Sequence, residues 1–482
     1  MKKNSIFKIL LLFILGTFIL SYIFPTAIDK SAQMQYMPIW SGLKYPLVVL
    51  EYFSTLPILI LVIGALYGIL NKTGYYHKVI GEITKKVTKN SVNFVVAMFI
   101  LFATLSSITS MGLGLLIFVP LVISVIIGLK YDKIVAFVCT FGAILIGNIS
   151  SIFNYNIIAG LIELYKLEVT DTIIIRIIIL IFSLAISVFF LLAYLKKGFN
   201  KKEVNLDNSE IEIVVDSKSK NKKSTTPVYI IIGIMFLIIL IGTFPWELIL
   251  NINIFTEIAT SMHKFELDSL TNLGSSLYNV KLDAYAPFIS TFDLPIIGNY
   301  SDSDFIILIL LSIVALKFTL KIKLDDIIEG FYDGIKTMIK PVTIVIIVHV
   351  ILIIGTYHPS YMFFVQHLNN LLNGFNLFIV SIITVLMTVF NVDINMFVQN
   401  IVMILGTNII DKDFNAILSI TIQTIYGLVS VISPTSLLLA LGLSYMNINY
   451  KTWLKYIWKT ILAIFILVLV ILIGWSLLIA MA

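Results

Sequence analysis

Long runs of Ile, Leu, Val and Phe, separated by short charged turns, fill most of the chain. Hydrophobic residues make up 59% of the 482 residues and charged residues only 12%, whereas soluble domains carry about 25% charged residues. A helix that crosses a bilayer needs about 20 apolar residues, and its backbone hydrogen bonds are satisfied internally. The sequence therefore predicts an all-α polytopic membrane protein with about 10–12 membrane elements.

Residues 427–436, which read GLVSVISPTS, interrupt one of these apolar runs with a proline and four hydroxyls. Pro434 removes a backbone donor and clashes with the preceding turn, so carbonyls just upstream lose their helical partners. At membrane depth such a backbone is tolerated only where protein buries it or water reaches it. We interpret the stretch as a broken helix at a binding site; a simple proline kink, with hydroxyls bonded to their own helix, is the alternative. The candidate binding residues are Ser430, Ser433, Pro434, Thr435 and Ser436.

A second interrupted run, residues 147–156, reads GNISSIFNYN. Like the first, it follows a charged turn and is embedded in apolar sequence. Two interrupted hydrophobic segments at corresponding places in two halves of a chain are typical of a transporter site. The candidate residues here are Asn148, Ser150, Ser151 and Asn154.

Two further apolar regions are divided by short polar stretches. Residues 105–114 (LSSITSMGLG) include Thr109 and Ser110, and residues 391–395 (NVDIN) include Asn391, Asp393 and Asn395. We expect each stretch to be the tip of a re-entrant hairpin. Close packing of small residues is the alternative for the first stretch, and a loop that reaches water is the alternative for the second. Each half of the chain would then hold one hairpin and one broken helix, as in inverted transporter repeats.

The distribution of lysines predicts orientation and domain organisation. Lys2, Lys3 and Lys8 precede the first apolar run, and five lysines lie within residues 71–90. By the positive-inside rule, the N-terminus and this loop are cytoplasmic. We expect a first repeat half at 1–195, a cytoplasmic linker at 196–226 and a second half at 227–482. The acid-rich stretch 245–303 in the second half is expected to lie outside.

Individual helices are also expected from the pattern. The second span is expected at 49–70, and the final helix at 457–481. An amphipathic segment, 325–340, is expected to lie at the membrane interface, before a separate span at 342–354.

Four short stretches resemble the YfcC/DcuC-type carriers, a family of four-carbon dicarboxylate anaerobic carriers and putative basic amino-acid antiporters. They occur in the family's order: GILNKTG at 68–74, GTFPWELI at 242–249, ISPTS at 432–436 and YKTWLK at 450–455. The resemblance implies the ion-transporter superfamily, a homodimer, and a scaffold domain beside a moving transport domain with two hairpins and two broken helices. It also implies that Ser150, Ser151 and Asn154, together with Ser433, Pro434, Thr435 and Ser436, face the substrate or a cation.

The chain departs from that family at both hairpin tips. The family usually carries Glu-Glu-Thr at the first tip, whereas residues 113–115 hold no carboxylate, and NVDIN replaces a Ser-Gly run at the second. Tyr155 stands where the first break usually has proline, and His349 lies near the place of a family arginine. Ionisable residues at membrane depth are costly and usually functional. Asp393 is therefore the acid that we expect to take a proton, a sodium ion or a substrate ammonium.

The sequence thus predicts a secondary active transporter of a small carboxylate-bearing solute, either an amino acid or a dicarboxylate. We expect it to be a multi-pass protein of the cytoplasmic membrane, coupled to Na⁺ or H⁺ or working by exchange, with elevator-type alternating access. The expected partners are the solute, the lipid bilayer and a second copy of the chain, without nucleic acid. No catalytic residues, no cofactor and no metal beyond a possible Na⁺ are expected. A membrane enzyme of lipid-linked glycan metabolism and a passive channel are the alternatives.

Overall fold

The computed structural model describes residues 5–24, 37–154, 158, 160–162, 165–196, 224–258, 260–261, 296–371, 376–391, 393–405 and 412–481. These residues form helices and no strand, and ten of the helices are long and apolar enough to cross a membrane. The prediction of an all-α polytopic membrane protein is confirmed. Most of the expected linker and most of the stretch 245–303 lie outside the described residues.

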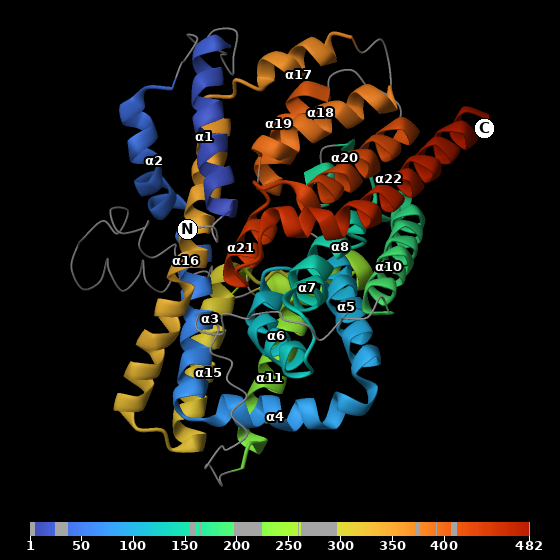
Figure 1. The fold of residues 1–482 in the computed structure, drawn as a ribbon. Coiled ribbons are helices and arrows are strands. Elements are labelled where there is room, and N and C mark those ends of the chain that lie inside the picture. The colour runs from blue at the N-terminus through green and yellow to red at the C-terminus, as the bar shows by residue number, and fades with distance from the viewer. Residues whose placement is uncertain are drawn as a thin grey trace.

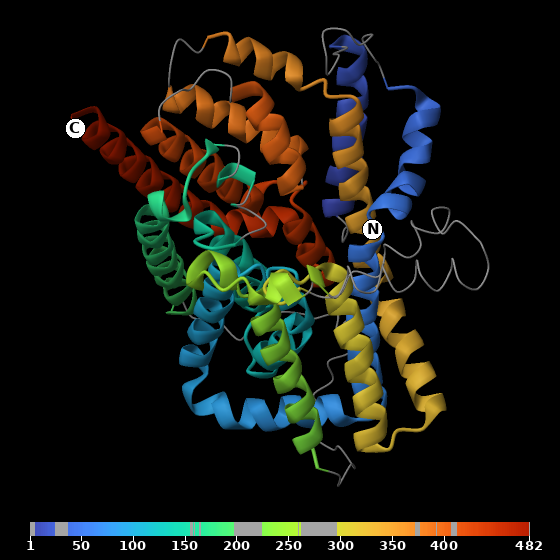
Figure 2. The same cartoon turned by 180° about the vertical axis from the view of Figure 1, so that it is seen from behind.

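One side of the molecule is a column of helices, which Figures 1 and 2 show side by side in both views. The column consists of α1 (Ser5–Ile23), α2 (Ile39–Tyr52), α3 (Thr55–Lys72), α15 (Asp302–Leu320) and α16 (Leu324–Tyr357). Beside it lies a bundle that contains both interrupted helices (Figure 1). Helix α4 (Tyr75–Val87) runs across one end of the molecule, between the column and the bundle.

Glycines let α3 and α16 approach to backbone contact. A Cβ added at Gly68 would lie 2.2 Å from the carbonyl oxygen of Gly330, and one added at Gly334 would lie 2.1 Å from that of Gly64. Small residues four positions apart are the pattern by which membrane helices pack most closely. A salt bridge of 2.6 Å between Lys72 and Glu329 joins the same two helices. The two halves of the chain are therefore packed together inside the column.

Several of the expected helix boundaries are wrong. The expected span 49–70 is divided between α2 and α3, because Pro57 can neither donate to the carbonyl of Phe53 nor fit against it. Conversely, the expected interfacial segment and the span after it form one 34-residue helix, α16, with Pro341 inside it. Packing against α3 along this helix outweighs the local cost of the proline. The final helix, α22 (Tyr450–Met481), begins earlier than expected.

The bundle contains two hairpin-like pairs of helices. In the first pair, α5 (Ser91–Ile108) is followed by the 3₁₀ turn Gly114–Ile117 and by α6 (Val119–Gly128). In the second pair, α18 (Leu377–Phe390) is followed by α19 (Ile394–Leu405). The two polar stretches that we expected at hairpin tips lie at these turns.

Each pair is followed by an interrupted helix. The first interrupted helix comprises α7 (Lys133–Phe137), a π-helical turn (Val138–Gly142) and α8 (Ala143–Ser150), and it ends at Ser151 in the left-handed region with φ 37°. The second comprises α20 (Lys412–Ile432) and α21 (Leu437–Tyr445). The order hairpin then interrupted helix recurs; that the two series are inverted repeats stays a prediction. The other helices are α10 (Ile173–Lys196), α11 (Thr226–Thr243), α12 (Trp246–Leu250) and α17 (Met362–Asn369).

Candidate functional site

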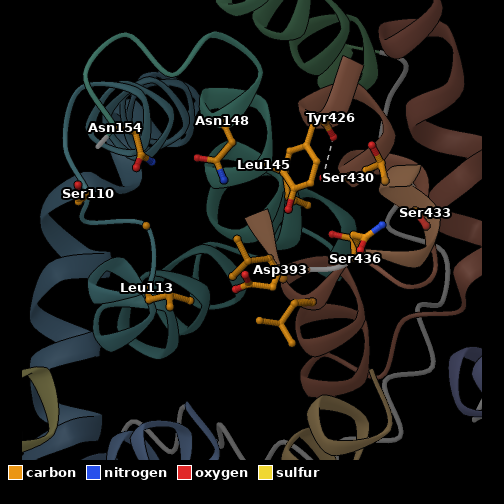
Figure 3. Close-up of a pocket in the computed structure, with 15 residues that line it drawn as sticks. Ser110, Leu113, Leu145, Asn148, Asn154, Asp393, Tyr426, Ser430, Ser433 and Ser436 are labelled. Atoms are coloured by element: carbon orange, nitrogen blue, oxygen red, sulfur yellow. Dashed lines mark hydrogen bonds between the residues drawn. The ribbon is translucent and has the colours of Figure 1, made fainter. Parts of the chain in front are cut away.

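A cavity of about 180 Å³ lies between the two hairpin tips and the two interrupted helices (Figure 3). Its walls come from each of the four polar stretches that the sequence singled out. The lining residues are Ser110, Gly112, Leu113, Leu145, Asn148, Asn154, Thr388, Asn391, Asp393, Tyr426, Ser430, Ser433, Ser436, Leu437 and Leu438. A cavity this small and this rich in hydroxyl and amide groups suits a small polar solute.

Residues from the two halves face one another across this cavity. In Figure 3, Ser110, Asn148 and Asn154 lie on one side, and Ser430, Ser433 and Ser436 lie on the other, with Asp393 between them. Of the expected site residues, those that line the cavity are Ser110, Asn148, Asn154, Asn391, Asp393, Ser430, Ser433 and Ser436. Those that do not line it are Thr109, Ser150, Ser151, Pro434 and Thr435. The side chain of Asn395 lies outside the described part of the chain.

Hydrogen bonds join the first tip to the first interrupted helix. The Ser106 hydroxyl donates to Oδ1 of Asn148 (2.6 Å), and the Asn154 amide donates to the Ser106 carbonyl (3.0 Å). The hydroxyls of Ser107 and Ser150 lie 2.7 Å apart. Two buried polar atoms of this wall, Oδ1 of Asn154 and Oγ of Ser110, have no hydrogen-bond partner. Because unsatisfied buried polar atoms are costly, the Ser110 hydroxyl is a candidate to donate to the solute, and Oδ1 of Asn154 is a candidate to accept from it.

The second interrupted helix is held in a similar way. Thr435 donates its hydroxyl to the Val389 carbonyl (2.8 Å), which ties the break to the second tip, and lies 2.6 Å from the Ser433 hydroxyl. The Ser430 hydroxyl donates to the Tyr426 carbonyl in its own helix (2.7 Å), as the alternative interpretation expected for such groups. Thr435 thus supports the wall of the cavity rather than lining it.

Side chains of the last helix donate hydrogen bonds to backbone carbonyls that the second break leaves without helical partners. Trp453 Nε1 donates to the Val431 carbonyl (2.9 Å), and the Tyr450 hydroxyl donates to the Ile432 carbonyl. Both residues belong to the YKTWLK stretch, so this contact gives that stretch a physical role.

The two interrupted helices touch one another directly. The buried side-chain amide of Gln423 in α20 donates to the carbonyls of Ile149 (3.3 Å) and Ser150 at the end of α8. A Cβ added at Gly427 would lie 2.6 Å from the Cα of Ile149. The structure therefore brings together the two stretches whose meeting was the basis of the transporter hypothesis.

Among the described side chains that line the cavity, Asp393 is the one ionisable acid or base apart from the Tyr426 phenol. It lies beside Asn391, whose amide donates to the Tyr361 hydroxyl (3.0 Å) and the Met387 carbonyl (2.9 Å) and accepts from Asn400. Asn391 therefore serves to hold the second tip. The remaining polar lining groups are neutral hydroxyls and amides, which can bind a carboxylate or a cation.

His349, which lies near the place of a family arginine, does not line the cavity. Its Nδ1 lies 2.9 Å from the Val345 carbonyl in its own helix, and its ring packs on Phe53 with centroids 4.9 Å apart. It is structural in this arrangement.

Several residues of the site had no assigned role in the sequence analysis. Thr388 and Tyr426 line the cavity, and Gln423 and Arg176 bind the end of α8. Polar side chains within the apolar helices α10, α18 and α20 were the available signal, because they need a partner at membrane depth.

Comparison with known proteins gives one family. The sequence model of the DcuC family, described as a C4-dicarboxylate anaerobic carrier, matches residues 53–476. This match spans every element that lines the cavity. No curated protein sequence matches the chain.

Proposed function

Since the chain belongs to the DcuC family of C4-dicarboxylate anaerobic carriers, we propose that it is a secondary active transporter that moves a small carboxylate-bearing solute across the cytoplasmic membrane. The observation that carries this proposal is the cavity between the two interrupted helices and the two hairpin tips. Broken helices that meet in this way present backbone and hydroxyl groups that can bind a solute but do not react with it covalently.

The solute carboxylate is proposed to bind the neutral donors of the cavity wall. The amides of Asn148 and Asn154 and the hydroxyl of Ser110 lie on the side opposite Ser433 and Ser436. Hydroxyls and amides can each donate to a carboxylate oxygen. No lysine or arginine is found among the described residues that line the cavity. This favours a solute whose negative charge is partly balanced by a positive group of its own or by a cation bound with it.

Asp393 is proposed to bind the positive charge that accompanies the solute. An ionised Asp393 beside a carboxylate solute would repel it, so a proton, a sodium ion or an ammonium group on the solute is needed between them. An amino acid supplies the ammonium itself, whereas a dicarboxylate needs the proton or the sodium ion. Coupling to Na⁺ or H⁺ would then act through Asp393, and exchange of one solute for another is the alternative.

Alternating access is proposed to occur by an elevator-type movement. The close glycine contact between α3 and α16 supports assigning the column as the part that stays fixed while the bundle moves. Both halves of the chain, 1–195 and 227–482, would contribute to the fixed column and to the moving bundle. A homodimer joined through the columns would keep them fixed in the membrane.

Uptake by proteoliposomes tests this function. The purified protein would be supplied with labelled succinate, aspartate or arginine, with and without gradients of Na⁺ and H⁺. A carrier accumulates an unmodified solute and shows counterflow when the vesicles are preloaded with it. A membrane enzyme would return a modified product, and a passive channel would show no counterflow, so either result would contradict the proposal.

A further inference from the structure

Arg176 is the single arginine in the 482 residues, and its side chain is only 1% exposed. It lies in α10, which passes the end of the first interrupted helix. Burying a guanidinium inside a membrane protein is costly unless its charge is used. The environment of this one side chain therefore indicates what the charge does.

The guanidinium is directed at the backbone where α8 ends. Nη1 donates to the Ser151 carbonyl (3.0 Å), and Nε donates to the Thr172 hydroxyl (2.9 Å). Nη2 has no hydrogen-bond partner. In the described part of the chain, no carboxylate lies within salt-bridge distance of Arg176. Among the described residues, the charge thus faces a backbone carbonyl and not an acid.

Protein donors satisfy the other carbonyls at this helix end as well. Ser151 itself donates its N–H to the Gly147 carbonyl (3.3 Å) and its hydroxyl to the Asn148 carbonyl (2.8 Å). The side-chain amide of Gln423 donates to the next two carbonyls, those of Ile149 and Ser150. The carbonyls of residues 147–151, which we call the carbonyl cluster, therefore accept hydrogen bonds from the protein's own side chains and backbone.

A helix C-terminus carries a partial negative charge, and unwound carbonyls at a broken helix are suited to a cation such as Na⁺. At the first break, the positive charge beside the helix end is the guanidinium of Arg176. At the second break, Trp453 and Tyr450 close the carbonyls with neutral donors, and Asp393 lies nearby in the cavity. The two breaks therefore differ in the charge that stabilises them.

We propose that Arg176 is a tethered cation that replaces a mobile coupling cation at the first interrupted helix, so that any coupling cation binds at the Asp393 side of the cavity. Arg176 is a positioning residue, because it holds the Ser151 carbonyl and does not line the cavity. This inference rests on the proposed carrier function, but its test requires no transported solute.

The test measures the thermal stability of purified protein in NaCl and in choline chloride at equal ionic strength. Arg176→Gln keeps a hydrogen-bond donor but removes the positive charge beside the Ser151 carbonyl, so it leaves that position to Na⁺. We expect NaCl to raise the melting temperature of this variant by about 3 °C or more relative to choline chloride, because a bound ion stabilises the folded state. The difference should be smaller in the wild type and in Arg176→Lys, which keeps a positive charge.

Lys196→Gln is the matched control, since it removes an exposed positive charge from the same helix; it should respond to NaCl as the wild type does. If Arg176→Gln does not fold without salt, recovery of folded protein by NaCl but not by choline chloride supports the proposal. Failure of NaCl to recover it, or an equal response of Arg176→Gln, Arg176→Lys and wild type, overturns it. Absence of transport would bear on the proposed function and not on this result.

Discussion

The side-chain amide of Gln423 donates to the backbone carbonyl of Ser150, a residue 273 positions earlier in the chain. This contact joins the two interrupted helices at the carbonyl end of the first. The same side chain also reaches the Ile149 carbonyl (3.3 Å). One buried residue thus couples the two walls of the cavity, and it gives the first prediction.

Replacing Gln423 by Leu should destabilise the protein, because the carbonyls of Ile149 and Ser150 would be buried without a donor. A buried polar group left in this way costs about 1–3 kcal/mol. Thermal unfolding in detergent measures the loss. Thr424→Val is the matched control, since the Thr424 hydroxyl donates only within its own helix (2.7 Å); an equal loss in both variants would contradict the assigned contact.

Replacing Asp393 by Asn should abolish the dependence of uptake on the coupling cation. If the solute carries an ammonium group, its affinity should also fall tenfold or more, which corresponds to about 1.4 kcal/mol. Initial uptake rates at varied solute and cation concentrations separate the two effects.

Asp325→Asn, which removes an exposed carboxylate of α16 far from the cavity lining, is the control and should transport normally. Unchanged uptake and unchanged cation dependence in Asp393→Asn would show that Asp393 has no part in binding.

Replacing Gly334 by Ala should disrupt the column, since the added Cβ would lie 2.1 Å from the Gly64 carbonyl oxygen. Overpacking of this kind costs about 1–3 kcal/mol. In contrast, Gly233→Ala places its Cβ in open space on α11 and should leave stability unchanged or slightly increased. The melting temperatures of the two variants provide the comparison, and similar values would argue against close packing of α3 on α16.

Replacing Thr435 by Val should loosen the second break from the second tip. The variant loses the hydrogen bond to the Val389 carbonyl (2.8 Å) and the contact with the Ser433 hydroxyl, while side-chain volume is nearly preserved. We expect weaker solute binding with a smaller loss of stability than Gln423→Leu shows, since Thr435 contacts one carbonyl. Thermal-shift titration with the transported solute measures both quantities, and wild-type affinity would contradict the role of this tie.

Both breaks could be located in the sequence because their signals are local. Pro434 removes a hydrogen bond that its own helix needs, and Ser150 and Ser151 stand out in an apolar run. In contrast, the donors that close the breaks could not be assigned from the sequence. Gln423 and Arg176 are visible as polar residues in apolar helices, but which carbonyl each one binds depends on how distant helices cross.

The helix boundaries differ for the same reason. Pro341 lies between the interfacial segment expected at 325–340 and the span expected at 342–354, and a proline is a local signal that a helix ends, yet α16 continues through it. The packing of Gly330 and Gly334 on α3 stabilises this helix through tertiary contacts. The residues next to the proline do not indicate that such contacts exist. Sequence periodicity alone could not weigh the two effects.

The central claim is that the solute binds in the cavity between the two interrupted helices, and protection of a cysteine in its wall tests this most directly. In a Cys139→Ser background, Ser436→Cys would be labelled with a maleimide at increasing solute concentration, with the exposed Lys196→Cys as the control. The account predicts that the transported solute slows labelling at Ser436→Cys, half-maximally near its KM for transport, and leaves Lys196→Cys unaffected. Equal labelling rates at Ser436→Cys with and without saturating solute would contradict it.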